Sequence, residues 1–189
     1  YLDQINTTAD RLTKMTSEIN QLIQLEDNQY KLDYTKIDLN EFFGTIGKMY
    51  QSGVQQSNID FQYQTNIPEG EYLEADRTAL EKIIFNLVGN AFKYNTTGSQ
   101  ISLNITKKNG DVEIEVCDDG PGIKEEKLSK IFERYYRTEE GAGIALGLGI
   151  GLSLAKDLVD LHGGQIRACS QPHKQTCFTV ILPLAPNQA

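Results

Sequence analysis

The stretch ISLNITKKNGDVEIEVCD, residues 101–118, decides the fold of this chain. Apolar and polar residues alternate along 101–106 and again along 112–117, which is the period of a strand with one buried face. The two runs meet at Asn109-Gly110, a dipeptide that readily adopts the positive backbone angles of a tight hairpin turn. The sequence therefore predicts an antiparallel hairpin.

Helices and strands are predicted on both sides of this hairpin. Upstream we expect a helix over 39–56, strands over 59–65 and 71–75, and a long helix over 75–95 with Asp76 or Thr78 in its first turn. Downstream we expect a short helix over 124–136, a glycine-rich stretch, a helix over 149–164, and strands over 164–170 and 176–183. Because helices and strands do not alternate as βαβ units, the fold class is α+β, a two-layer α/β sandwich with the helices on one face of the sheet.

The first 26 residues carry a heptad stripe. Its positions are Leu2, Ile5, Ala9, Leu12, Thr16, Ile19, Ile23 and Glu26. The stripe indicates one long amphipathic helix of a bundle, although a helix packed on its own domain has a similar stripe. Because the polar stretch 26–36 follows it, we place the bundle helix in 1–28, a linker in 29–37 and the main domain in 38–186.

Composition limits the possible partners. The 189 residues carry a formal charge of −8, which argues against a nucleic-acid or anionic-membrane surface. No apolar run has the length of a membrane span, and we expect no targeting leader within this segment. Cys117, Cys169 and Cys177 lack metal-ligand spacing, so we expect free buried thiols in a reducing compartment.

The helix over 75–95 carries polar residues beside its apolar stripe. Asn86, Asn90 and Lys93 lie within about 60° of one another around the helix axis. The amides could simply cap nearby backbone, but two amide oxygens beside one cation also suit a hydrated Mg²⁺ and a polyphosphate. The helix is therefore predicted to line a pocket.

Two glycine-rich stretches follow. In CDDGPGIKEE, residues 117–126, Asp118 lies at a strand end; the stretch is a turn by itself, but a carboxylate there can also accept the amino group of a base such as adenine. Gly147, Gly149 and Gly151 alternate where a helix begins, which favours an anion cradle over simple loop packing. Arg134 or Arg137 could reach phosphate oxygens from the segment before it.

Four stretches in this order resemble the N, G1, F and G2 boxes of the catalytic ATP-binding domain of sensor histidine kinases, members of the Bergerat-fold superfamily. They are residues 86–95, CDDGPGI (117–123), IFERYYR (131–137) and GLGIGL (147–152), and the resemblance runs from about residue 39 to 184. It implies an α/β sandwich with helices on one face of a mixed sheet. The helix in 1–28 resembles the second helix of the dimerisation and phosphoacceptor hairpin.

The resemblance also implies roles for single residues. Asn90 and Asn86 would coordinate Mg²⁺, Lys93 would meet phosphate, and Tyr94 would pack near the nucleotide. Asp118 would take the adenine amino group, and Gly120 and Gly122 would flank the ring. Tyr136 and Arg137 would belong to the lid. The full ATP-binding set is Asn86, Asn90, Lys93, Tyr94, Asp118, Gly120, Gly122, Ile123, Tyr136, Arg137, Gly147, Leu148, Gly149, Gly151 and Leu152, with Asn90, Lys93 and Arg137 as the catalytic residues.

The chain departs from the family pattern in two places. Leu148 stands where a small hydroxyl residue is common and Ile150 where Leu is usual, which matters little because backbone amides hold the phosphates. No phosphoacceptor motif is present, and His162 and His173 fit capping or surface roles better. We therefore expect a chain truncated within the hairpin, which holds the phosphate donor without its acceptor.

The function implied is transfer of the γ-phosphate of ATP, with Mg²⁺, to a histidine on the dimerisation helix of the same or a partner subunit. A response-regulator receiver domain would follow as acceptor, and the full-length protein would be a homodimer. The resemblance further implies the cytoplasmic portion of a bacterial membrane-anchored sensor, with no direct membrane contact by this segment.

Hydrolysing relatives carry a glutamate where Asn86 stands here, and an amide cannot act as a base. The alternatives are an ATPase that drives conformational change, with Glu81 as its base, a module whose nucleotide site has decayed, and a serine kinase acting on an anti-sigma partner.

Overall fold

The computed structural model describes residues 2–27, 29–53, 58–96, 98–137 and 148–184. In chain order the elements are α1 (Leu2–Glu26), β1 (Tyr34–Asp38), α2 (Leu39–Gly53), β2 (Asp60–Asn66), β3 (Tyr72–Asp76), α3 (Arg77–Tyr94), β4 (Gln100–Lys108), β5 (Asp111–Asp118), α4 (Glu125–Leu128), α6 (Gly151–Leu161), β6 (Gln165–Gln171) and β7 (Gln175–Pro183).

The main sheet has five strands in the order β2-β4-β5-β7-β6. β2 runs parallel to β4, and the other neighbours are antiparallel, so the sheet is mixed. The predicted hairpin is confirmed, because β4 pairs with β5 and the turn residues Asn109 and Gly110 have φ angles of 56° and 88°. A separate two-stranded sheet joins β1 to β3.

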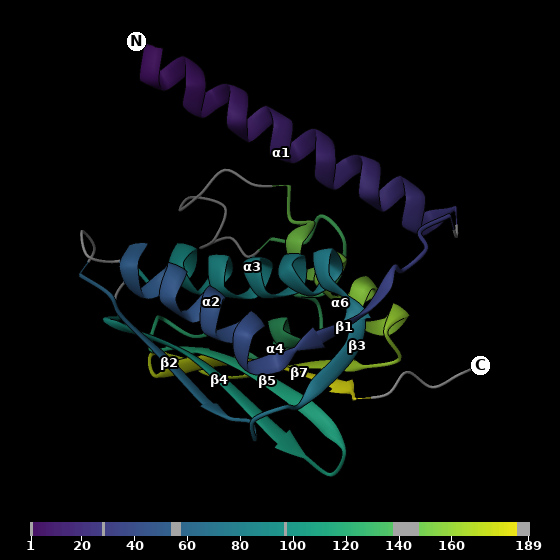
Figure 1. Ribbon diagram of the computed structural model, residues 1–189. Helices are drawn as coiled ribbons and strands as arrows, with labels where there is room; N and C mark the ends of the chain where they lie inside the picture. Colours follow the sequence, from purple (N-terminus) through teal and green to yellow (C-terminus); the bar gives the residue numbers. More distant parts are fainter. Residues whose placement is uncertain (1, 28, 54–57, 97, 138–147, 185–189) are drawn as a thin grey trace.

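Helices cover one face of the main sheet, as predicted. Figure 1 shows α2, α3 and α6 above the sheet and α1 crossing on their outer side. The core lies between the two layers, because alternate side chains of β4 and β5 and the apolar stripe of α3 are all fully buried. These residues are Ile101, Leu103, Ile105, Val112, Ile114, Val116, Leu80, Ile83, Ile84 and Leu87.

Two predicted boundaries differ from the structure. Residues 34–37, expected in the linker, belong to β1 and pair with β3, where Ile37 is buried. The helix expected over 124–136 is reduced to α4, and Tyr135 has a φ of 63°, which a right-handed helix does not accommodate. Of the two residues proposed for the start of α3, Asp76 is the N-cap, because its side chain accepts from the Ala79 N–H.

The prediction of free thiols is wrong for Cys117 and Cys177. These residues lie opposite one another on β5 and β7 and form a disulfide. They are 60 positions apart in the sequence, so only the pairing of the strands brings them together. Cys169 is a free cysteine, and it is exposed rather than buried.

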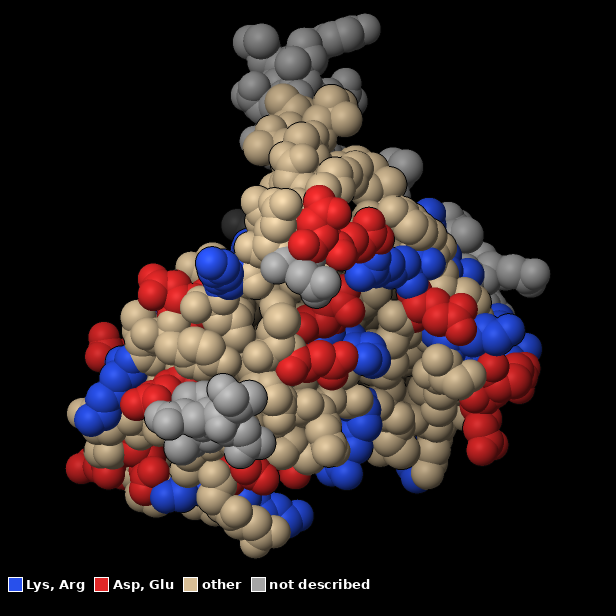
Figure 2. Space-filling view, turned by 90° about the vertical axis from the view of Figure 1, so that its right-hand side faces the viewer, with Lys and Arg blue, Asp and Glu red and all other residues tan. Residues whose placement is uncertain are grey.

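Acidic and basic side chains are interspersed on the side of the molecule shown in Figure 2, and no wide field of Lys and Arg covers the described residues of that face. Among the described residues, no helix combines the length and the apolar character needed to cross a membrane.

Candidate functional site

A cavity of about 230 Å³ opens beside α3 at the ends of β5 and β7. Its apolar walls include Ile123, Ile131, Leu152 and Phe178, and one buried carboxylate, that of Asp118, lies among them. The remaining lining residues are Asn90, Tyr94, Pro121, Gly122, Lys124, Lys127, Tyr136, Arg137, Pro172, His173 and Thr176. A mostly apolar pocket with few polar groups is typical of a small-molecule site.

Asp118 is the last residue of β5, and its side chain is 7% exposed. The pKa of this carboxyl is raised to about 6, mainly by burial and to a smaller extent by the charge of Asp119. The hydrogen bond from the Gly120 N–H opposes this shift. The Gly120 nitrogen lies 3.0 Å from Oδ1 of Asp118. A carboxylate has further lone pairs, so this group can also accept an amino group of a ligand.

The neighbouring Asp119 has a structural role instead. Its Oδ1 accepts from the backbone N–H groups of Ser99 at 2.8 Å and Gln100 at 2.7 Å, and from Nδ2 of Asn95 at 3.1 Å. Burial raises the pKa of Asp119, but these hydrogen bonds outweigh that effect and lower the pKa. Asp119 therefore ties the end of β5 to the start of β4, which orients Asp118 toward the cavity.

Asn95 lies beside this pair at the end of α3. Its Oδ1 atom is buried and accepts no hydrogen bond from the described residues. Because a buried acceptor without a partner costs free energy, and Asn95 does not line the cavity, an ordered water is the donor that suits this oxygen.

Glycines allow close contacts around the cavity. A Cβ atom at Gly122, whose φ is 75°, would lie 2.5 Å from the carbonyl oxygen of Gln171. A Cβ atom at Gly151 would lie 2.9 Å from Oδ1 of Asn86. A side chain at residue 151 would therefore require the Asn86 amide, where α6 approaches α3, to move.

The residues predicted for the site fall into three groups. Eight of them line the cavity: Asn90, Tyr94, Asp118, Gly122, Ile123, Tyr136, Arg137 and Leu152. Six do not: Asn86, Lys93, Gly120, Leu148, Gly149 and Gly151. Gly147 lies outside the described residues.

Some of the six predicted residues that do not line the cavity still lie close to it. Gly120 donates to Asp118, and Asn86 is next to Gly151 at the start of α6. Lys93 carries its ammonium 4.7 Å from the ring centroid of Tyr94, a cation–π contact beside the cavity. Of the two arginines proposed as phosphate ligands, Arg137 lines the cavity, whereas Arg134 pairs elsewhere.

Sequence reasoning missed several lining residues. Lys124 and Lys127 come within four residues of the end of the CDDGPGI stretch, so their positive charge so near a predicted nucleotide site is a usable signal. Thr176 and Phe178 come from β7, and Thr176 enters the site because it pairs with Asp118. No pattern of adjacent residues predicts that Thr176 pairs with Asp118.

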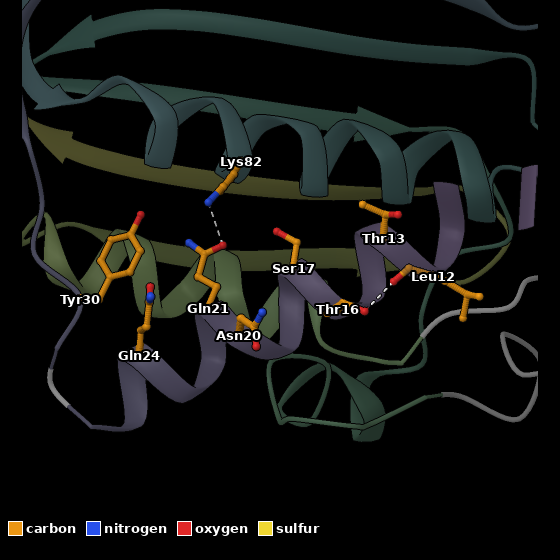
Figure 3. A pocket seen from close by; sticks show the side chains of 9 residues that line it. All are labelled: Leu12, Thr13, Thr16, Ser17, Asn20, Gln21, Gln24, Tyr30 and Lys82. Atoms are coloured by element: carbon orange, nitrogen blue, oxygen red, sulfur yellow. Dashed lines mark hydrogen bonds between the residues drawn. The ribbon is translucent and has the colours of Figure 1, made fainter. Parts of the chain in front are cut away.

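A larger cavity, of about 600 Å³, lies between α1 and α3 (Figure 3). Figure 3 shows polar side chains of α1 facing it, and Lys82 of α3 donates from Nζ to Oε1 of Gln21 at 2.9 Å. Its lining is Leu12, Thr13, Thr16, Ser17, Asn20, Gln21, Gln24, Tyr30 and Lys82. It contains no acidic side chain among these residues, so the smaller cavity is the better candidate for binding a base.

The end of α1 is also held to the domain. Arg134 forms ion pairs with Glu26 of α1 and with Asp157 of α6, the latter at 3.0 Å. Leu22 is 4% exposed and belongs to the core cluster. Arg134 therefore links the segment 131–137, which contributes residues to the cavity wall, to α1.

Known proteins resemble this chain in sequence and in fold. The family model described as histidine kinase-, DNA gyrase B-, and HSP90-like ATPase matches residues 75–186. Sensor histidine kinase YcbM of Bacillus subtilis (strain 168) is 32% identical over 183 residues, which are 96% of this chain and 58% of that protein. The sensor-like histidine kinase SenX3 of Mycolicibacterium smegmatis is 29% identical over 99% of this chain and 48% of its own length.

Solved structures agree with these matches. The catalytic domain of histidine kinase ThkA has a TM-score of 0.70 and 29% identity, over 83% of this chain and 99% of that one. ThkA in complex with response regulator protein TrrA gives a TM-score of 0.75 at 25% identity, over 98% of this chain and 52% of that one. The chain spans 13% to 58% of the length of the first curated relatives it matches.

Proposed function

Because this chain belongs to the family of histidine kinase-, DNA gyrase B- and HSP90-like ATPases, as an ATP-binding catalytic domain of the sensor histidine kinase type, we propose that it transfers the γ-phosphate of ATP to a histidine imidazole on a bundle helix. The observation that carries the proposal is the buried carboxylate of Asp118 in an apolar cavity that Asn90 also lines. The end of the cavity at Asp118 can select a base, and the end at Asn90 can hold the charged phosphates with their metal ion.

The residues present fit adenine. Asp118 would accept the exocyclic amino group through a charge-assisted hydrogen bond, which distinguishes adenine from a base with a carbonyl at that position. Ile123, Leu152 and Phe178 supply apolar surface for the flat ring. Gly122 keeps the loop backbone close to β6, so the ring has a rigid wall.

The residues at the other end fit Mg²⁺ and phosphates. Asn90 lines the cavity and Asn86 lies one helical turn earlier, so both can offer amide oxygens, the ligand type that suits magnesium. The metal would supply neutralisation of charge on the polyphosphate. Arg137 and Lys124, which line the cavity, and Lys93 beside it would add positive charge where phosphate oxygens gather.

Transfer to an imidazole, rather than to water, is supported by the chemistry of α3. Asn86 has no basic group to activate water. Glu81 is paired with Arg77 at 3.3 Å on the surface and does not line the cavity. None of the cavity-lining residues that the structure describes is a glutamate. The conformational ATPase is therefore the weaker alternative.

The partners belong to the same proposal. We place α1 in a dimerisation bundle, and its exposed heptad residues support this: Leu12 is 60%, Ile19 43% and Ile23 49% exposed. The acceptor histidine would come from a bundle helix of the same or a partner subunit. A response-regulator receiver domain would take the phosphate next, in line with the ThkA–TrrA complex. We place the domain in the cytoplasm, where ATP is available, as part of a membrane-anchored sensor.

The test uses radiolabelled ATP, the 189-residue chain and a separate helical hairpin that carries a histidine followed by an acidic residue. We expect label on the hairpin, little release of free phosphate without it, and loss of labelling with Asn90→Ala. Asn104→Ala, in which the changed residue lies on β4 and does not line the cavity, is the matched control. Rapid hydrolysis without the hairpin, or labelling that survives Asn90→Ala, would refute the assignment.

A further inference from the structure

Three cysteines lie in one row across neighbouring strands. Cys177 of β7 pairs in register with Cys117 of β5 on one side and with Cys169 of β6 on the other. Val116 and Phe178, which adjoin Cys117 and Cys177, face the core, so alternation places the cysteines on the face of the sheet opposite the helices (Figure 1). We name these three residues the cysteine row.

The row holds one disulfide and one thiol. Cys117 and Cys177 are bonded, whereas Cys169 is free and exposed. Directly opposite residues in an antiparallel pair have Cα atoms roughly 4.5–5.5 Å apart, within the range of roughly 4.4–6.8 Å that a disulfide spans. Cys177 can therefore be bonded to either neighbour without a change of strand register.

Two of the cysteines adjoin residues that line the proposed nucleotide site, and the third adjoins a residue that contacts the site. Asp118 follows Cys117, and Thr176 precedes Cys177; both line the cavity and pair with each other across β5 and β7. Ser170 follows Cys169, and its Oγ accepts from the Ile123 N–H at 2.8 Å. Ser170 also lies 3.0 Å from the Thr176 hydroxyl. The crosslink that is present thus determines which two strands are tied together beneath the cavity.

We propose that the cysteine row is a thiol–disulfide exchange site, in which the bond moves between Cys117–Cys177 and Cys169–Cys177 and thereby changes the affinity of the adjoining cavity for nucleotide. Exchange requires the attacking sulfur, the central sulfur and the leaving sulfur to lie nearly in line. The order of the strands, β6-β7-β5, places Cys177 between the other two cysteines, as this reaction requires.

The reaction balances within the chain. Cys169 gives its proton to solvent and attacks Sγ of Cys177 as a thiolate. The Cys169–Cys177 bond forms, the Cys117–Cys177 bond breaks, and Cys117 leaves with the electron pair and takes a proton from solvent. Glu115 offers a carboxylate oxygen within 4.8 Å of both bonded sulfurs. Exchange needs no external oxidant, whereas full reduction needs a dithiol.

The effect on nucleotide rests on the proposed function. The Cys117–Cys177 bond fixes the spacing of Asp118 and Thr176, the residue pair next to it. A pocket whose walls are fixed beforehand loses less freedom on binding. A permanent disulfide is also unusual in a compartment that supplies ATP and keeps thiols reduced, where disulfides are mostly regulatory. We expect the affinity for Mg-ATP to fall three- to tenfold when the bond is reduced or moved.

The exchange is tested by peptide mapping. The 189-residue chain is kept overnight at pH 8 with EDTA, because Glu115 and two reduced cysteines could hold a metal ion, and is then alkylated and digested without reduction. We expect both linkages in the wild type, Cys117–Cys177 alone in Cys169→Ser, and Cys169–Cys177 in Cys117→Ser or Cys117→Ala after oxidation with diamide. A wild type that holds only the Cys117–Cys177 linkage overturns the exchange, whatever the variants show.

The coupling is tested by calorimetry with Mg-ATP before and after reduction with dithiothreitol. The wild type and Cys169→Ser should lose affinity three- to tenfold, and Cys177→Ala, which can form neither bond, should match the reduced wild type in both conditions. Equal affinity of the oxidised and reduced wild type overturns the coupling. No Mg-ATP binding in either state refutes both the proposed function and the coupling, while the peptide map still decides the exchange.

Discussion

The affinity of the cavity for nucleotide is expected to depend on pH through Asp118. Its pKa is raised to about 6 by burial, so lowering the pH through 6 protonates the carboxyl in the unbound chain. The protonated group is no longer a pure acceptor for the adenine amino group. Because a bound amino group favours the ionised form, affinity is full above pH 6 and is lost as the pH falls.

The magnitude follows from the pKa. With a pKa of about 6, roughly 97% of the carboxyl groups are ionised at pH 7.5 and roughly 10% at pH 5, so the dissociation constant should rise about tenfold between these values. Asp118→Asn keeps an oxygen for the Gly120 N–H but removes the charge. A hydrogen bond to a charged group contributes about 1.5–3 kcal/mol, which corresponds to roughly ten- to 150-fold weaker binding at pH 7.5.

Isothermal calorimetry at pH 5, 6 and 7.5 measures both effects. The nucleotide titrates in this range as well, so the informative quantity is the difference between the wild type and Asp118→Asn, which shares the titration of the nucleotide. Asp160→Asn, at an exposed position of α6, is the matched control and should keep the affinity of the wild type. If the wild type and Asp118→Asn lose affinity in parallel, the Asp118 carboxylate is not the acceptor.

The same residue affects stability with the opposite sign. The folded-state pKa of Asp118 lies above its ordinary value of 3.8, so its contribution to stability is full below that value and is lost as the pH rises through 6. Asp118→Asn should therefore raise the melting temperature of the nucleotide-free chain at pH 7.5 by a few degrees, since about 1 kcal/mol corresponds to ~2–4 °C at this size. A lower melting temperature would contradict the burial argument.

Three further predictions concern the surrounding structure. Burial lowers the pKa of His162, whose Nε2 accepts a backbone N–H at 3.1 Å. The contribution of His162 to stability is therefore present above pH 6.5 and is lost as the pH falls. In urea unfolding, the stability difference between the wild type and His162→Gln should shrink from about 1–2 kcal/mol at pH 7.5 toward zero at pH 5. Gly122→Ala should cost about 1–3 kcal/mol in thermal melts, whereas Gly89→Ala, with nothing within 4 Å of the new Cβ, should stabilise α3 by up to about 1 kcal/mol; equal effects would refute the close approach at residue 122. Arg134→Ala should speed hydrogen exchange at the end of α1 by up to about fivefold, because partly exposed ion pairs contribute less than about 1 kcal/mol, and Lys156→Ala should leave it unchanged.

The local elements could be predicted from the sequence because their signals lie in adjacent residues. The alternation over 101–118 and the Asn109-Gly110 turn specify the hairpin without any distant contact. The period of α3 likewise places Asn86 and Asn90 beside its apolar stripe. The position of Asp118 at a strand end indicates a binding role, because a carboxylate there can accept the amino group of a base.

Other features depend on which strands pair and in which register, and only the tertiary structure decided them. Ile37 became part of a strand because β3 lies opposite it, and Thr176 entered the site because β7 pairs with the end of β5. The same pairing joined Cys117 to Cys177, against expectation. Adjacent residues determine the type of each element, but contacts between residues far apart in the sequence are set by how the layers pack, and the composition of the cavity follows from that packing.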